Sequence, residues 1–184
     1  MRAIVMILLS ALLLTACQTK NTAAAPPKLQ DSPQEDEVRE GDFIFRLVSE
    51  KKKYEEYEKP EIYAELTYVG QNEEIRISHA ASPFSFPIHE KTRGYTVDYA
   101  MNTPLLITNL KRGEPYRESY EFAGGYSNQD DEDYVVFVQS IIDHSGFPKG
   151  DYSMEGYANF SIIDDSDTSE KEMNMRLQIG YEVE

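Results

Sequence analysis

The sequence predicts an all-β fold, a sandwich of about seven to nine strands with one short helix in a crossover connection. Three observations predict this class. From residue 42 onward, apolar residues mostly recur at every second position, which is the period of a strand with one buried face. The chain ends in two long alternating runs that flank an acidic loop, as in a long hairpin. The strands do not alternate with helices, so nothing indicates a parallel sheet.

The first predicted strands are short and are separated by turn residues or charged segments. The clearest of them is 62–69, in which alternate residues from Ile62 to Tyr68 share one face. A charged connection that ends in proline, 51–60, precedes it. The other strands expected before the helix are 43–47, 75–78, 95–99, 105–108 and 116–122.

One segment departs from the period of two. Its apolar residues recur with helical spacing, at Tyr134, Phe137, Val138 and Ile141. Four acidic residues, 130–133, come directly before it and suit a helix N-terminus, and Ser145-Gly146 follows as a stop. We therefore expect a helix from about 131 to 143. The many β-branched residues of this run leave a strand as the alternative.

Alternation is clearest at the C-terminus. Two runs, 152–162 and 173–183, place apolar residues at every second position, and the segment 164–172 between them is acidic. This pattern predicts a long hairpin. Each of its strands has one apolar face, so the hairpin must pack against a second sheet.

A local motif suggests which kind of sandwich this is. The run Phe147-Pro148-Lys149-Gly150-Asp151-Tyr152 precedes the penultimate strand and resembles the corner of immunoglobulin-like domains. In that family the tyrosine hydroxyl ties the corner to upstream backbone. The strand layout is also similar to bacterial immunoglobulin-like proteinase inhibitors of the BsuPI type. These resemblances imply one immunoglobulin-like domain over 42–184.

The N-terminus carries a targeting signal. The apolar run 3–14 would rise only about 18 Å as a helix, less than the roughly 30 Å hydrocarbon core of a bilayer, which is typical of a signal peptide. It leads into Leu14-Thr15-Ala16-Cys17, which resembles the lipobox of bacterial lipoproteins, and Cys17 is the single cysteine. The resemblance implies a signal peptide at 1–16, a lipid on Cys17, and a location on the extracytoplasmic face of the cell membrane. The segment 79–88 is similar to uncharacterised small lipoproteins of Gram-positive spore-formers.

Residues 17–41 predict a disordered tether. Proline, glutamine, serine and acidic residues dominate this segment, and it contains too few large apolar residues to form a core. As a random coil it would reach about 25–30 Å from the bilayer. The alternative is a tail that binds a partner.

Charge and composition exclude several classes of function. The chain has 18 Lys and Arg against 33 Asp and Glu, a formal net charge of −15. Nucleic-acid binding depends on neutralising phosphates with basic side chains, so nucleic acid is not an expected partner. Anionic lipid surfaces attract basic segments, so the acidic domain is expected to stand off the bilayer, with the lipid as its membrane contact.

No motif for catalysis or for metal binding was found. The chain contains no Gly-x-Ser-x-Gly elbow and no phosphate-binding loop. The three histidines, His79, His89 and His144, lack the spacing of a zinc site, and the acidic loops lack the glycine of a calcium loop. We therefore expect no catalytic residue, no metal and no cofactor.

The candidate binding residues are Phe84, Phe86, Arg93 and Tyr95. The two phenylalanines lie between prolines that would stiffen a loop, and the other two follow closely. Burial of both phenylalanines in the core is the competing interpretation. The expected function is a binding module at the cell surface, with a protein partner of the cell envelope or another ligand. The alternatives are an extracellular protease inhibitor that presents this loop, a cell-surface enzyme and a calcium-responsive module.

Overall fold

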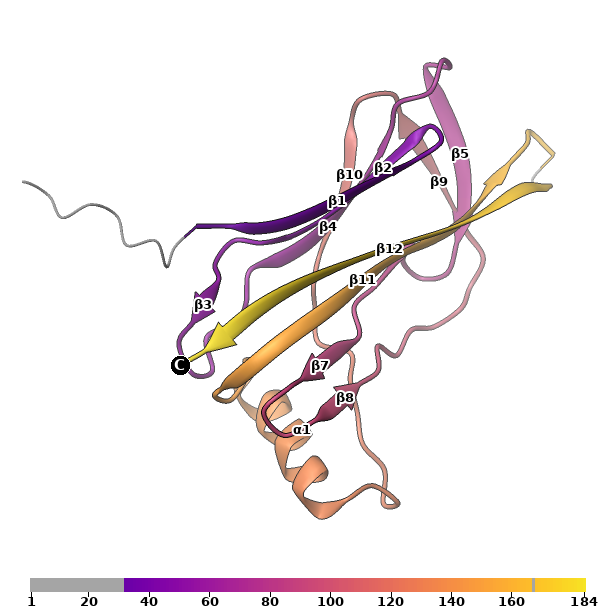
Figure 1. Ribbon diagram of the computed structural model, residues 1–184. Coiled ribbons are helices and arrows are strands. Elements are labelled where there is room, and N and C mark those ends of the chain that lie inside the picture. Colours follow the sequence, from indigo (N-terminus) through magenta and orange to yellow (C-terminus); the bar gives the residue numbers. More distant parts are fainter. Residues whose placement is uncertain (1–31, 167) are drawn as a thin grey trace, which may run out of the picture.

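The computed structural model describes residues 32–166 and 168–184, and it shows an all-β sandwich with one short helix (Figure 1), as the sequence predicts. These residues form twelve strands, more than the seven to nine expected, because several strands have only two or three residues. One layer is a sheet of four antiparallel strands in the order β1-β2-β4-β10. Their bounds are β1 Gln34–Glu40, β2 Phe43–Ser49, β4 Ile62–Tyr68 and β10 Pro115–Ser119.

The second layer is an eight-stranded sheet built around the C-terminal hairpin. Its main path runs β3-β12-β11-β5-β9, and three short strands, β6, β7 and β8, join it beside β11. The pairing of β3 with β12 is parallel, and the other pairings are antiparallel. The bounds are β3 Lys53–Tyr54, β5 Glu74–His79, β6 Phe84–Ser85, β7 Ile88–Glu90, β8 Tyr95–Val97, β9 Leu106–Lys111, β11 Gly150–Ile163 and β12 Ser169–Val183.

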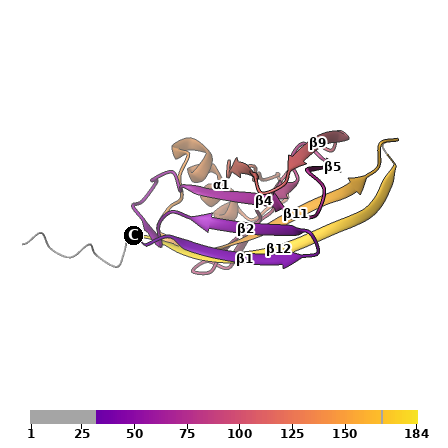
Figure 2. The ribbon, with the colours of Figure 1, turned by 90° about the horizontal axis from the view of Figure 1, so that it is seen from above.

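The core lies between the inner faces of the two sheets. Phe43 of β2 meets Phe160 of β11 edge to face, with ring centroids 4.9 Å apart. The sheets also approach each other at one edge, where β1 lies beside β12 (Figures 1 and 2) and the backbone N–H of Gln178 donates to Asp36 Oδ2 at 3.3 Å. Burial of alternate apolar residues from both sheets is what holds the layers together.

The predicted C-terminal hairpin is confirmed. β11 and β12 pair from Gly150↔Val183 to Ile163↔Ser169, with one irregularity between Ile162 and Ile163. The alternate residues of β12 that the sequence assigns to the apolar face are all buried: Met173, Met175, Leu177, Ile179, Tyr181 and Val183. The expected immunoglobulin-like corner also forms, because the Tyr152 hydroxyl donates to the carbonyl oxygen of Pro148 at 2.6 Å.

The helix expected at about 131–143 is α1, Glu132–His144. The Asp131 side chain caps it by accepting from the Asp133 N–H at 2.9 Å. Ser145 ends it in the left-handed region, at φ 57°, and its N–H donates to the Ile141 carbonyl. α1 lies at one end of the sandwich, in the connection from β10 of one sheet to β11 of the other (Figure 1).

The predicted tether boundary is wrong. Within the segment expected to be disordered, Gln34–Glu40 forms β1, and all seven of its residues pair with β2. Val38 packs against the core, so the domain begins before residue 42. Apolar and polar residues do not alternate clearly in β1, because it is an edge strand with charged residues on both faces. These charges also protect the edge from pairing with other chains.

Residues 1–31 lie outside the described part of the chain, and the expected signal peptide, Cys17 and most of the tether fall there. Among the residues that are described, no helix has the length and apolar character needed to cross a membrane.

Candidate functional site

The two phenylalanines expected in an exposed loop are buried. Phe84 is 0% and Phe86 2% exposed, so the competing interpretation, burial in the core, is the correct one. Phe84 lies in β6, opposite Ala158 of β11, and its ring stacks on Phe45 at a centroid distance of 5.8 Å. A protease inhibitor would need a rigid exposed loop, and this segment does not supply it.

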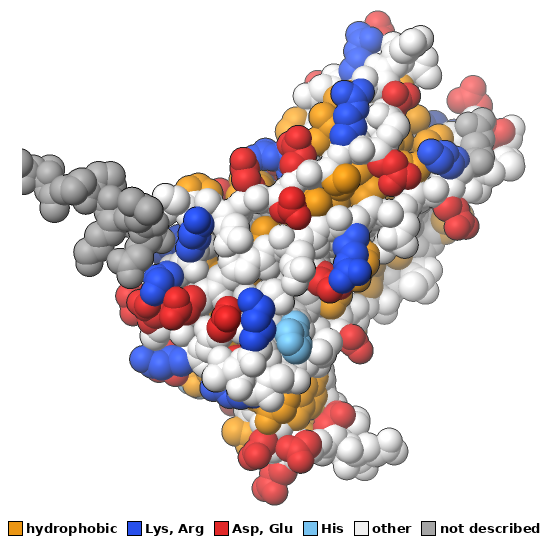
Figure 3. Space-filling view, viewed as in Figure 1, with side chains coloured by type: hydrophobic (Ala, Val, Ile, Leu, Met, Phe, Trp, Pro, Cys, Tyr) orange, Lys and Arg blue, Asp and Glu red, His pale blue; other side chains and the backbone are white. Residues whose placement is uncertain are grey.

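The other two candidates, Arg93 and Tyr95, lie at the surface beside α1. The Arg93 guanidinium sits over the ring of Phe137, 5.5 Å from its centroid, and donates to the carbonyl of Lys149 at 3.0 Å. Tyr95 meets Tyr134 edge to face at 5.5 Å. Together with residues of α1 they line a shallow groove of about 460 Å³. Hydrophobic atoms are exposed at this end of the molecule (Figure 3).

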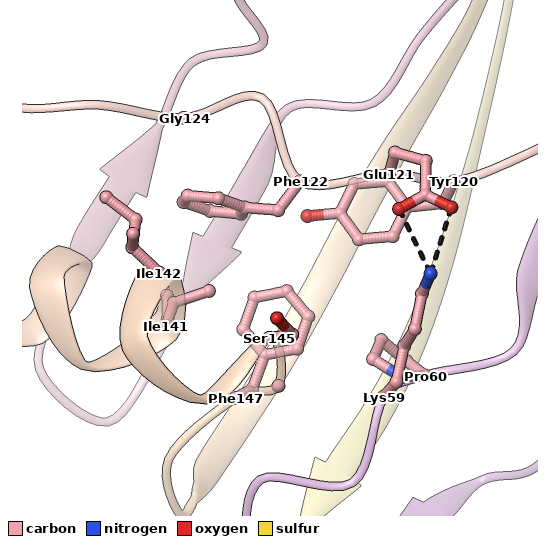
Figure 4. Close-up of a pocket in the computed structure, with 11 residues that line it drawn as sticks. Lys59, Pro60, Tyr120, Glu121, Phe122, Gly124, Ile141, Ile142, Ser145 and Phe147 are labelled. Atoms are coloured by element: carbon pink, nitrogen blue, oxygen red, sulfur yellow. Dashed lines mark hydrogen bonds and ion pairs between the residues drawn. The ribbon is translucent and has the colours of Figure 1, made fainter.

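A more enclosed cavity lies on another side of α1, and its volume is about 330 Å³. We call it the Tyr120 cavity (Figure 4). Three segments build it: the connection before β4, the chain after β10, and the C-terminal turn of α1 with the residues that follow. It is lined by Lys59, Pro60, Tyr120, Glu121, Phe122, Gly124, Ile141, Ile142, Ser145, Gly146 and Phe147.

The walls of the Tyr120 cavity are mainly apolar. The rings of Phe122 and Phe147 meet edge to face at 6.4 Å, and Ile141 and Ile142 close the side formed by α1 (Figure 4). Ile142 is 47% exposed, so it presents apolar surface both to the cavity and to solvent. Such walls favour an apolar ligand, because burying its surface removes it from water.

The hydroxyl of Tyr120 is a buried polar group in the wall of the cavity. Tyr120 is only 4% exposed, and its hydroxyl has no hydrogen-bond partner among the described residues. The ring presents the hydroxyl to the space beside Phe122 and Phe147 (Figure 4). Burial raises the pKa of Tyr120 well above its usual value, and the neighbouring Tyr99 and Glu121 raise it further. The group therefore stays protonated and can donate a hydrogen bond.

A second buried hydroxyl without a partner in the described chain belongs to Tyr181. The ring of Phe147 lies between the two tyrosines, 6.3 Å from Tyr120 and 5.9 Å from Tyr181. Tyr181 does not line the Tyr120 cavity, because its ring packs against Tyr152 in the core. Of these two tyrosines only Tyr120 lines the cavity, and its hydroxyl is buried in the cavity wall.

An ion pair crosses the rim of the cavity. Lys59 Nζ lies 2.9 and 3.0 Å from the two carboxylate oxygens of Glu121 (Figure 4). Beyond this pair lies a second cavity of about 410 Å³. We call it the acidic cavity, and it is lined by Glu50, Lys59, Pro60, Glu61, Ile62, Tyr63, Arg117, Ser119, Tyr120 and Glu121.

The sequence did not single out these site residues. Tyr120 and Phe122 belong to a predicted strand, 116–122, whereas β10 ends at Ser119. The sequence marks Phe147 only as part of the corner motif 147–152. One feature of the sequence could have indicated the cavity. Phe122 and Phe147 lie just outside regular elements, and the periodic pattern of helices and strands does not show what such large aromatic side chains pack against.

In the described part of the chain, no group of three or more His, Cys, Asp or Glu side chains could hold a metal ion. No protein-family model matches this sequence, and no curated protein was found to be similar to it. The groups that the Tyr120 cavity offers are recognition groups: apolar walls, one phenolic hydroxyl and an ion pair at the rim.

Proposed function

We propose that this protein is a lipid-anchored lipoprotein on the extracytoplasmic face of the cell membrane, and that its sandwich domain binds a ligand in the Tyr120 cavity. The anchor is inferred from the resemblance of Leu14-Thr15-Ala16-Cys17 to a lipobox. The binding role depends on one observation, the unpaired Tyr120 hydroxyl buried in the wall of a mainly apolar cavity of about 330 Å³. Ligand sites commonly have about this size and this combination of apolar walls with a few polar groups.

The unpaired hydroxyl supplies a reason for ligand binding. A buried hydroxyl without a partner lowers stability by about 1–3 kcal/mol. If the Tyr120 ring turns so that its hydroxyl reaches the cavity, a ligand atom that accepts a hydrogen bond from it would recover part of this energy. Apolar groups of the ligand would add about 25 cal/mol for each Å² removed from water. The cavity thus favours a mostly apolar ligand with one polar atom near Tyr120.

The binding role is tested with a fragment library and two variants. Protein carrying Cys17→Ala is purified without detergent, and fragment binding is followed by NMR. We expect fragments that bind near Phe147 to lose about 5- to 30-fold in affinity in Tyr120→Phe, as expected for one lost hydrogen bond. Tyr157→Phe is the control, because Tyr157 lies on β11 and lines neither cavity. Equal affinity in Tyr120→Phe and wild type would contradict the role of Tyr120.

The anchor is tested separately in cells. Cys17→Ala should move the protein from the membrane fraction to the soluble extracytoplasmic fraction, because two lipid chains would no longer hold it. The melting temperature of the purified variant should match that of the lipidated protein. If Cys17→Ala stays in the membrane fraction, the proposed anchor is wrong.

A further inference from the structure

We infer that the ligand is an elongated organic cation, with its apolar body in the Tyr120 cavity and its cationic end in the acidic cavity. This inference rests on the proposed binding function of the Tyr120 cavity and adds the chemical class of the ligand.

The two cavities adjoin each other. They share four lining residues, which are Lys59, Pro60, Tyr120 and Glu121. The buried Tyr120 side chain is therefore a common wall of the two cavities, and its hydroxyl points toward Phe122 on the side of the Tyr120 cavity (Figure 4). A ligand longer than one cavity would pass beside this ring.

The charges of the acidic cavity that are left unpaired are negative. Both basic side chains in its lining are already engaged. Lys59 pairs with Glu121, and Arg117 donates to Glu65 at 2.5 and 2.8 Å. Within the described chain, neither Glu50 nor Glu61 forms a side-chain ion pair.

The charge of Glu50 affects the pKa of the neighbouring Tyr63. The pKa of Tyr63 is raised mainly by burial, against the lowering effect of Arg117, and the carboxylate of Glu50 raises it further. The protein as a whole carries a formal charge of −15. The overall field therefore attracts a cation and repels an anion.

The ion pair between the cavities can yield to a ligand. The side chains of Lys59 and Glu121 are 58% and 70% exposed, and exposed pairs stabilise a protein by only about 0.2–1 kcal/mol. A ligand that displaces this pair therefore loses little. A cationic ligand can also take the place of Lys59 beside Glu121.

The experiment compares three probes with the same apolar body and different ends: 4-phenylbutylamine, 4-phenyl-1-butanol and 4-phenylbutanoate. Binding to the chain carrying Cys17→Ala is measured by calorimetry at low salt and neutral pH. The amine should bind about five- to tenfold more tightly than the alcohol, as expected for two partly solvated carboxylates, and the carboxylate most weakly. Added salt should reduce the preference for the amine.

Matched variants locate the effect. In Glu50→Gln with Glu61→Gln, the amine should bind no better than the alcohol, and the affinity of the alcohol should be unchanged. The control is Glu55→Gln with Glu56→Gln, which removes two exposed carboxylates that line neither cavity. A melting temperature close to that of the parent protein verifies that each variant is folded.

The outcomes separate this inference from the proposed function. Equal affinity for the amine and the alcohol, or an amine preference that survives loss of Glu50 and Glu61, overturns the cationic ligand and leaves the binding function standing. If none of the three probes binds more tightly to the parent protein than to Tyr120→Phe, both proposals fail.

Discussion

At the scale of single residues, Glu65 is a buried charge held by two arginines. Its side chain is 5% exposed and accepts hydrogen bonds from Arg46 at 2.7 Å and from Arg117 at 2.5 and 2.8 Å. These three residues occupy facing positions in the strand register. On β1, Glu37 faces Arg46 at 3.6 Å, and Glu35 also pairs with this arginine. One row of alternating charge therefore crosses all four strands of the smaller sheet, and Glu65 is its buried member.

Replacing Glu65 should weaken the fold. Glu65→Gln leaves two arginines without their shared carboxylate. Because Arg46 and Arg117 are 33% and 52% exposed, we expect a loss of about 1–2 kcal/mol, below the 3–5 kcal/mol of a fully buried pair. Urea unfolding measures this loss of unfolding free energy. Glu114→Gln, in an exposed pair with Lys111, should change stability by less than about 0.5 kcal/mol. Similar values for both variants would contradict this interpretation.

The buried tyrosines predict a stability that depends on alkaline pH. Burial, followed by the hydrogen bond to Glu118, raises the pKa of Tyr116 to about 12, and burial raises the pKa of Tyr120 and Tyr181 well above the usual value. In the unfolded chain these groups ionise near about 10. Above that pH the folded state holds more protons than the unfolded state, so the unfolding free energy falls as pH rises.

The measurement is the unfolding free energy from neutral to alkaline pH, together with the ultraviolet absorbance of phenolate. Stability should be constant below about pH 10 and should fall from there toward about pH 12. Tyr116→Phe should make the fall less steep. Ionisation of all tyrosines in one step near pH 10, with the protein still folded, would contradict the prediction.

At the scale of elements, the contact between the turn at 55–58 and the end of α1 positions one wall of the Tyr120 cavity. The N–H of Tyr57 donates to the carbonyl of Phe147 at 2.9 Å, and the Tyr57 ring stacks on His144 at 4.0 Å. Tyr57 adopts a φ of 62°, which is uncommon for a residue with a side chain. A Cβ on Gly146 would lie 2.2 Å from the Tyr57 carbonyl oxygen, so only glycine permits this approach.

Gly146→Ala should therefore separate the turn from α1. We expect a loss of about 1–3 kcal/mol in unfolding free energy, as for overpacking of a rigid contact, and weaker ligand binding, because Phe147 follows directly. Gly125→Ala is the control, because a Cβ there meets no atom within 4 Å. Chemical denaturation gives both values. An unchanged stability in Gly146→Ala would show that the turn can move away freely.

The elements differ in how well the sequence predicts them. α1 and the C-terminal hairpin were predicted because their apolar periods are long and unbroken. β6 and β7 have two and three residues, too few to display a period, and Pro87 between them suggests a loop. β1 was missed because pairing with β2, not an apolar face, defines it.

At the scale of the whole molecule, the Tyr120 cavity could not be predicted, because it joins distant segments. Lys59 and Glu121 meet across 62 positions of sequence, and α1 adds the third side. Residue types in isolation do not show which connections approach each other when the sheets pack. The layered β architecture could be predicted, because the alternation of apolar residues within each strand indicates its buried face. The site could not, because it depends on where the chain segments between the sheets meet.

The corrected domain boundary gives a prediction for the whole chain. A chain that begins at residue 42 lacks β1, so it loses the partial burial of Val38 and exposes the edge of β2. Compared with a chain that begins at residue 32, we expect a loss of about 1–3 kcal/mol and association that increases with concentration, because a bare edge pairs with other chains. Thermal melting and light scattering measure these effects. Identical behaviour of the two chains would restore residue 42 as the boundary.

The pairing of β1 with β2 also has a mechanical consequence. The residues that precede Gln34 join β1 at the end farthest from the turn between β1 and β2. Seven residue pairs, from Gln34↔Ser49 to Glu40↔Phe43, lie between that end and the turn. Tension applied along β1 is shared by all seven pairs at once. Tension applied across β1 acts on Gln34↔Ser49 first and peels the pairs apart one after another. If residues before β1 carry the membrane anchor, the direction of pull decides how much force the domain withstands.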